Sequence, residues 1–186
     1  MQPPASGRRR QLVLGSIGVG AAAIAAGLAT RRPSGGRELR FASLADAQDE
    51  LGRLGRAPTL ASVAAWSWAQ TLDHCAQSIE YSMSGFPQMK SALFQRTVGA
   101  AAIAVFAWRG RMTHDLAEPI PGAPPLAADA AAGVATGRLD AAMRAFLQWP
   151  GPLQPHFAYG ELAKPAYERA HAMHLANHLS AFRVER

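Results

Sequence analysis

Two segments of the chain begin with the spacing of a helix capping box. S-x-x-D at residues 43–46 and S-x-x-Q at residues 67–70 each place a serine hydroxyl three positions before a side chain that can return the hydrogen bond. Apolar residues then recur every three or four positions, as on one face of a helix, until a glycine is reached. The pattern therefore predicts two helices that end near Gly55 and Gly85, and it constrains the fold more than any other feature.

Three further segments extend the helical prediction. Residues 91–109 contain an almost wholly apolar stretch before Gly110, and we expect a buried core helix there. Residues 128–148 carry one apolar face, and a last helix is expected from about Pro165 to about Phe182. Alanine is frequent and no alternating strand pattern is present, so the expected fold class is all-α, an antiparallel helical bundle with long loops at 110–127 and 149–162.

Composition excludes several classes of protein. The 186 residues suffice for one domain with a buried core, and the single cysteine, Cys75, excludes an intramolecular disulfide. The formal charge of +6 includes three arginines in the first 29 residues, where no acidic residue occurs. The rest is only mildly basic and lacks a basic run with interleaved aromatics, so no nucleic-acid partner is expected.

The first 29 residues have the layout of an export signal. A polar head that ends in three arginines precedes an uncharged stretch rich in glycine and alanine, and small residues follow at 27–29. The pair Arg9-Arg10 resembles the twin-arginine motif, which makes the twin-arginine export machinery an expected partner. A periplasmic or other extracytoplasmic location is therefore expected.

The alternative for this segment is an uncleaved membrane anchor. Residues 11–30 are long enough to span a bilayer, although glycine and alanine are poor lipid-facing residues. Only in that case is the membrane a partner. We expect residues 1–29 to form the signal, 30–40 a linker and 41–186 the helical domain.

The predicted last helix carries three histidines on one side. His174 and His178 are four residues apart, so their Cβ atoms lie about 6 Å apart and both rings can reach one metal ion. His171 lies one turn before His174. A histidine pair of this kind can also be an ordinary polar face. His74, in the middle of the second predicted helix, is the candidate third ligand, and its alternative is a hydrogen-bonded core histidine.

Several stretches resemble a known family. The strings WSWAQTLDHCAQSIEYSMSGFP, FQRTVG, RGRMTHDL, PIPGAP and PHFAYGELAKPAYERAHAMHLANHL resemble the family designated domain of unknown function 1569, which is similar to the DinB/YfiT-like metalloenzymes. The resemblance covers nearly all of residues 41–182. It implies a four-helix core with an extra helix. It also implies that His74, His174 and His178 hold one divalent metal ion with positions left open.

The resemblance and the ligand chemistry together suggest a function. Imidazole nitrogens suit Zn, Ni or Fe, and an ion with an open position activates water or polarises a substrate. We therefore expect an exported metal-dependent hydrolase or transferase with a small-molecule substrate. The alternative is a non-catalytic metal-binding or protein-interaction helical module. A homodimer is an open alternative, and no G-x-S-x-G, P-loop or G-x-G-x-x-G motif assigns a catalytic residue.

Other residues are expected to support the metal ligands or to line a pocket beside them. His114 and His156 lie in the two long loops, which either fold over one end of the bundle or pack only as loops. Cys75 is expected to be buried and inert. The complete set of supporting or pocket residues is His171, Gln77, Tyr81, His114, His156, Tyr159 and Tyr167.

Overall fold

The computed structural model describes residues 35–185, so the predicted signal at 1–29 lies outside the described residues. The helical elements are α2 (Leu44–Gly55), α3 (Trp68–Ser84), α4 (Ala92–Phe94), the π-helical turn η1 (Gln95–Gly99), α5 (Ala100–Arg109), α6 (Ala132–Gln148) and α7 (Lys164–Leu179). Two short strands, β1 (Leu60–Ser62) and β2 (Phe182–Val184), pair antiparallel. The predicted all-α class is confirmed. Within the described residues, no helix has the length and apolar character needed to cross a membrane.

Both predicted capping boxes are present. Ser43 and Asp46 exchange hydrogen bonds at the start of α2, and Ser67 and Gln70 do the same at the start of α3. These contacts satisfy backbone N–H groups that have no partner within the helix. The chain leaves α3 at Gly85, whose φ of 106° is a left-handed value that favours glycine.

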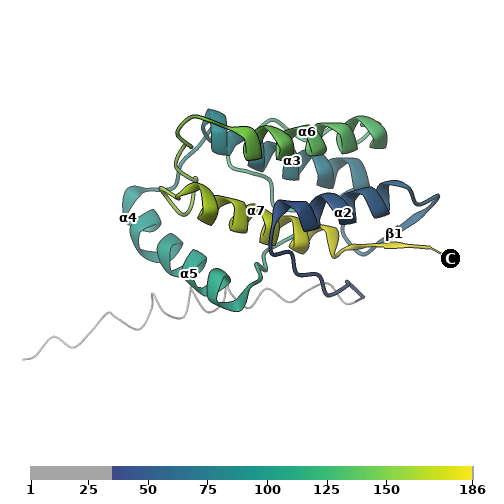
Figure 1. Ribbon diagram of the computed structural model, residues 1–186, viewed down its shortest axis with the longest axis horizontal. Coiled ribbons are helices and arrows are strands. Elements are labelled where there is room, and N and C mark those ends of the chain that lie inside the picture. The colour runs from purple at the N-terminus through teal and green to yellow at the C-terminus, as the bar shows by residue number, and fades with distance from the viewer. Residues whose placement is uncertain (1–34, 186) are drawn as a thin grey trace, which may run out of the picture.

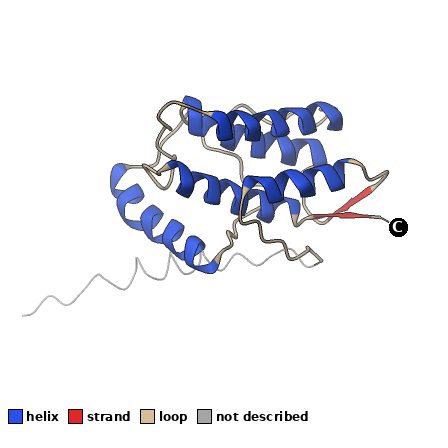
Figure 2. Cartoon of the chain, in the orientation of Figure 1, coloured by secondary structure: helices blue, strands red, loops and turns tan. Residues whose placement is uncertain are grey.

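Helices α2, α3, α6 and α7 form the body of the molecule (Figure 1). Helix α6 lies along α3, and α7 packs against both α2 and α3. Their shared core consists of side chains with almost no exposed surface, among them Leu54, Leu72, Leu139, Phe146 and Leu175. The strands lie at the opposite end of the bundle from α4 (Figure 2). Helix α7 ends at Leu179, before the expected Phe182, because Phe182 begins β2.

The prediction of a helix over 91–109 is confirmed for residues 92–109, but the prediction that it is buried in the core is wrong. This segment is divided into α4, η1 and α5, and it lies at the side of the bundle (Figure 1). Leu93 is 74% exposed and Trp108 is 85% exposed, whereas Phe106 is the buried side chain of α5. Uninterrupted apolar sequence does not distinguish a helix surrounded by core from one that covers the core with a single face.

One glycine fixes the distance between this side segment and the loop before α7. A Cβ atom at Gly99 would lie 1.9 Å from the backbone oxygen of Ala158, and real Cβ contacts are never that short. The last turn of η1 therefore approaches residues 156–160 as closely as backbone allows. The contact links the α4–α5 side of the molecule to the chain that leads into α7.

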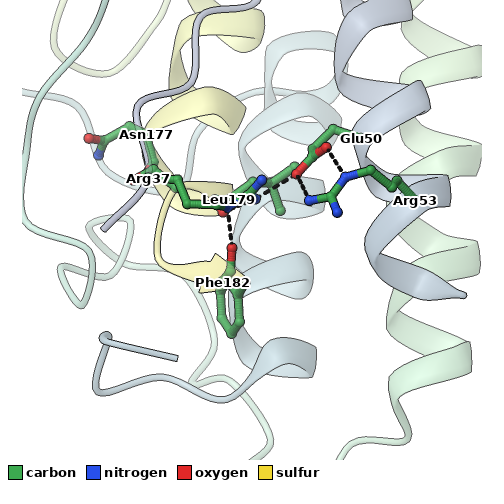
Figure 3. Close-up of polar contacts among 7 residues, drawn as sticks. Arg37, Glu50, Arg53, Asn177, Leu179 and Phe182 are labelled. Atoms are coloured by element: carbon green, nitrogen blue, oxygen red, sulfur yellow. Dashed lines mark hydrogen bonds and ion pairs between the residues drawn. The ribbon is translucent and has the colours of Figure 1, made fainter. Parts of the chain in front are cut away.

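The first described residues are held against the end of α7 (Figure 3). The backbone N–H of Arg37 donates to the Ser180 oxygen, and its guanidinium donates to the oxygens of Leu179 and Phe182. Leu179 is the last residue of α7 and Ser180 is its C-cap, so their carbonyls have no donor within the helix, and Phe182 begins β2. Arg37 lies in the segment expected as linker, and it also forms an ion pair with Glu50 of α2.

Glu50 joins two arginines at this junction. Arg53 binds the same carboxylate through two hydrogen bonds of 2.7 and 2.8 Å. Burial raises the pKa of Glu50, but hydrogen bonds from Arg53 and Arg37 more than offset this, so the pKa lies below its ordinary value. The carboxylate therefore stays charged near neutral pH and fixes Arg37 between α2 and α7.

The close approach at Gly99 predicts a large cost for one methyl group. Gly99→Ala should lower the free energy of unfolding by about 1–3 kcal/mol, because the added Cβ must displace backbone at Ala158. Gly137→Ala in α6 is the matched control, since its Cβ meets no atom within 4 Å. We expect this control to raise stability by about 0.5–1 kcal/mol. Urea denaturation of both variants checks the prediction, and equal effects would contradict it.

The contacts of Arg37 predict that its removal weakens the end of α7. Arg37→Met should lower the free energy of unfolding by about 1–3 kcal/mol, because buried carbonyl acceptors lose their donor. Arg53→Met is the control, because Arg53 binds the same Glu50 but donates to no carbonyl of α7. Hydrogen exchange at the last turn of α7 should accelerate in Arg37→Met only. Acceleration in both variants would assign the effect to Glu50 instead.

Candidate metal centre

Three imidazoles meet between α3 and α7. His74 comes from α3, and His174 and His178 come from successive turns of α7. One nitrogen from each ring can be chosen so that all three lie within 4.8 Å of one another. The predicted approach of His74 to the pair a hundred residues later is therefore present in the structure. It arises because α3 and α7 pack side by side.

The closest pair has the separation expected of two metal ligands. The Nε2 atoms of His74 and His174 are 3.2 Å apart. Two nitrogens bound tetrahedrally to zinc at about 2.0–2.1 Å lie about 3.3 Å from each other. The distance also fits a hydrogen bond in which one ring donates, so it does not identify a metal site by itself.

The unpartnered nitrogens are compatible with metal binding. Both ring nitrogens of His178 and Nδ1 of His74 are buried and have no hydrogen-bond partner among the described residues. Burying polar atoms without partners costs free energy, of the order of 1–3 kcal/mol for each group. A divalent ion that accepts one lone pair from each ring would offset part of this cost. The residues present therefore fit a metal ion.

The electrostatic setting keeps these rings neutral. Burial, together with the neighbouring His114, lowers the pKa of His74 to about 3. Burial also holds the pKa values of His174 and His178 well below the ordinary value, and adjacent imidazoles add to the effect. A neutral imidazole is the form that binds metal, so no proton has to be removed first near neutral pH.

Trp66 closes one side of the cluster. Its ring centroid is 5.0 Å from that of His74, and it stacks on His178 at 6.3 Å with an interplanar angle of 9°. The residue immediately precedes Ser67, the N-cap of α3, so the capping box fixes where the indole enters. The indole covers two of the imidazoles.

His114 approaches the cluster from the loop between α5 and α6. Its ring centroid is 5.1 Å from that of His174 and 4.9 Å from that of His178. Nδ1 lies 2.8 Å from the backbone oxygen of Asp115, which can only accept, so Nδ1 carries the proton and Nε2 has the lone pair. Asn177 of α7 donates to the His114 carbonyl and holds this loop in place.

His156 and Tyr159 form a second aromatic group on the loop before α7. The backbone N–H groups of Ala158 and Tyr159 both donate to Nδ1 of His156, so the proton of this neutral ring is on Nε2. The rings of His156 and Tyr159 stack at 4.2 Å. Burial, together with the nearby His171, lowers the pKa of His156 to about 3.

His171 is separate from the three-histidine group. It is 2% exposed and lies between Tyr167, at 5.3 Å, and Phe146, whose ring meets it edge-on at 5.0 Å. Its Nε2 is buried without a hydrogen-bond partner. Tyr167 donates its hydroxyl to the backbone oxygen of Gln154. The three histidines of α7 therefore divide into a converging pair and one that packs among aromatic rings.

A cavity of about 370 Å³ adjoins the histidine cluster. His74, His114 and His174 line one part of it, and His156, Tyr159, Tyr167 and His171 line another. The rest of the lining is largely apolar, with Phe94, Val98, Ala102 and Phe106 from the α4–α5 segment and residues such as Met112 and Ile120 from the loop that follows it. The sequence identified the histidines and tyrosines of the lining but missed this apolar wall. The signal was the apolar stretch 98–108, which the prediction placed in the core.

The other candidate residues lie elsewhere. Gln77 donates to the Pro124 carbonyl, and Tyr81 packs against Phe86, and neither lines the cavity. Arg138 of α6 binds both Asp73 and Glu80 of α3. Cys75 is fully buried, and burial raises the pKa of its thiol, which agrees with the expected inert role.

Comparison with known families places the chain. A family model described as "Protein of unknown function (DUF1569)" matches residues 34–185. The chain belongs to the DUF1569 family. No curated protein and no solved structure matches it. The DUF1569 match spans the helical domain that carries the three histidines, and membership by itself assigns no reaction.

The lowered pKa values predict that the metal-free protein loses stability in acid. Above about pH 6.5 the ring of His171 is neutral both folded and unfolded, and below it only the unfolded chain takes up a proton. The folded ring protonates only near its pKa of about 3. Stability is therefore lost as the pH falls from about 6.5 to about 3, by up to about 1.4 kcal/mol per pH unit for each such ring.

A variant isolates the contribution of one ring. His171→Gln removes the titrating group. The free energy of unfolding of this variant should therefore depend less steeply on pH between 7 and 5, with a slope smaller by the equivalent of up to one bound proton. Urea denaturation of both proteins in the presence of a chelator measures the two slopes. Identical slopes for the two proteins would contradict the prediction, because they would show that His171 takes up a proton at the same pH in the folded and the unfolded state.

Proposed function

We propose that this DUF1569 protein is a metal-dependent enzyme that binds one divalent ion through His74, His174 and His178 and acts on a small molecule in the adjoining cavity. One observation carries the proposal. His178 is 1% exposed, and neither of its ring nitrogens has a hydrogen-bond partner among the described residues. Two further neutral imidazoles lie beside it within ligand distance.

Open access to the cluster supports an enzyme rather than a structural metal site. Structural zinc sites are closed by four protein ligands, whereas catalytic sites have three and keep a position for water or substrate. Here three histidines form the group, and the cavity reaches two of them. A zinc, nickel or iron ion held by these histidines would lower the pKa of a bound water or polarise a carbonyl. This chemistry suits hydrolysis or group transfer.

Other residues around the cluster have distinct roles in excluding water and in hydrogen bonding. Trp66 covers His74 and His178 and keeps water from that side. The Nε2 lone pair of His114 can accept a hydrogen bond beside the open face. His156 offers the opposite function, since its Nε2 carries a proton and the ring lines the cavity. An acceptor and a donor therefore border the same cavity.

Two broader proposals accompany this function. We propose that the DUF1569 domain is related to the DinB/YfiT-like metalloenzymes, which is supported by a helical bundle that supplies one histidine from α3 and two from α7. We also propose that the protein is exported before it acts, which is supported by the signal-like layout of residues 1–29. Folding around a metal before export suits the twin-arginine route, which carries folded proteins.

Metal analysis tests the proposal. The untagged protein, loaded with zinc or cobalt and then dialysed, should retain one equivalent of metal. His74→Ala, His174→Ala and His178→Ala should each weaken binding more than about 100-fold, beyond the 10–100-fold loss typical of residues that only orient ligands. Competition with a chromophoric chelator measures the affinities.

A control on the same helix separates ligand loss from damage to the fold. His171→Ala removes an equally buried imidazole one turn away, and it should change metal affinity by less than tenfold. Circular dichroism of each variant reports whether the helices remain. Full metal retention by a folded His178→Ala protein would overturn the proposal.

A further inference from the structure

We infer that the cavity binds a small amphiphilic carboxylate, whose apolar chain packs against the α4–α5 segment and whose carboxylate faces the ion at His74, His174 and His178. The inference rests on the proposed metal site and names the class of ligand that the site takes. The observations that carry it are the apolar wall, the charge of the cluster and the way α5 is packed.

The part of the cavity wall that comes from the α4–α5 segment is suited to a hydrocarbon. Phe94, Val98, Ala102 and Phe106 line the cavity at intervals of four residues, so they lie on one face of the continuous α4–η1–α5 segment. They come from a segment that contributes little to the core, where Gly99 and Phe106 are its buried residues. Phe106 packs against Met112 and against Met173 of α7, and the same face of the segment also lines the cavity.

The charge of a metal ion at the three-histidine group favours an anionic ligand group. All three ligand side chains are imidazoles, which bind a metal ion as neutral groups, and the group of converging side chains contains no carboxylate. A bound divalent ion keeps its full charge there, and a buried charge is stable only when it is paired. Asp73 and Glu80 cannot supply the pair, because Arg138 binds both. A ligand carboxylate supplies the missing negative charge.

The remaining lining favours a single negative charge over a phosphate group. Phosphate sites use bidentate arginines or several backbone N–H groups, and no arginine lines this cavity. Lys90 and Glu118, both exposed, are the oppositely charged residues of its lining. The stacked rings of His156 and Tyr159 are neutral and line the cavity, so they suit an uncharged middle part of the ligand.

A series of chain lengths tests the inference with cobalt as the probe metal. Acetate, butyrate, hexanoate and octanoate are titrated into the cobalt-loaded protein, and the d–d absorption bands report changes at the ion without any assay of activity. We expect each buried methylene to tighten binding about fourfold, which makes octanoate at least 100-fold tighter than acetate. Octyltrimethylammonium, which has the chain but the wrong charge, should leave the bands unchanged.

Two substitutions on α5 form a matched pair. Ala102→Phe fills the cavity, so it should weaken octanoate binding at least tenfold while acetate binding and cobalt affinity stay the same. Ala104→Phe places the same side chain two residues later at an exposed position, and it should leave all three unchanged.

The outcomes distinguish this inference from the proposed metal site. If no d–d bands appear, the metal site itself fails. If the bands form but acetate and octanoate bind equally, or Ala102→Phe binds octanoate as the unsubstituted protein does, the metal site stands and the inference is overturned. Equal octanoate binding without cobalt would likewise overturn the role given to the ion.

Discussion

The candidate site depends on the burial of unpaired imidazoles between α3 and α7. Neutral rings of His74, His174 and His178 are packed together, and three of their nitrogens are buried without a hydrogen-bond partner. Such an arrangement costs free energy that the hydrophobic core has to offset. The packing of α3 against α6 and α7, with side chains such as Leu72 and Leu139 fully buried, provides that support. The candidate metal cluster, whose burial costs free energy, is therefore held by closely packed helices of the core.

Two tethers fix the helix that carries most of the site. At its end, Arg37 joins the carbonyls that follow His178 to Glu50 on α2, so the first described residues hold the last helix. Before its start, Gly99 lets η1 touch the backbone at Ala158, close to His156. Helix α7 is thus fixed at both ends by segments from distant parts of the sequence. Side chains of α7 line the cavity, and the α4–α5 segment forms another part of its wall.

Local sequence rules predicted the helices where local physics decides them. The capping boxes at Ser43 and Ser67 formed as expected, because their hydrogen bonds join residues only three positions apart. The same rules failed for residues 91–109. Apolarity showed that this segment needed burial but not against what, and Trp108 is exposed while Phe106 faces the cavity. Helix α7 also ended early because Phe182 pairs with Ser62 in the sheet, a contact between residues far apart in sequence.

The sequence by itself determined that His174 and His178 share a helix face, because a spacing of four residues fixes this in any α-helix. It named His74 as a candidate partner from its place in the middle of an apolar helix, and the family resemblance strengthened this choice, but nothing local links residues a hundred positions apart. Tertiary structure decided that His74 lies within reach of the pair, and that His171 packs against aromatic rings instead. It decided these points because burial, partner atoms and cavities are created when helices pack, and helical periodicity carries no information about which helices meet.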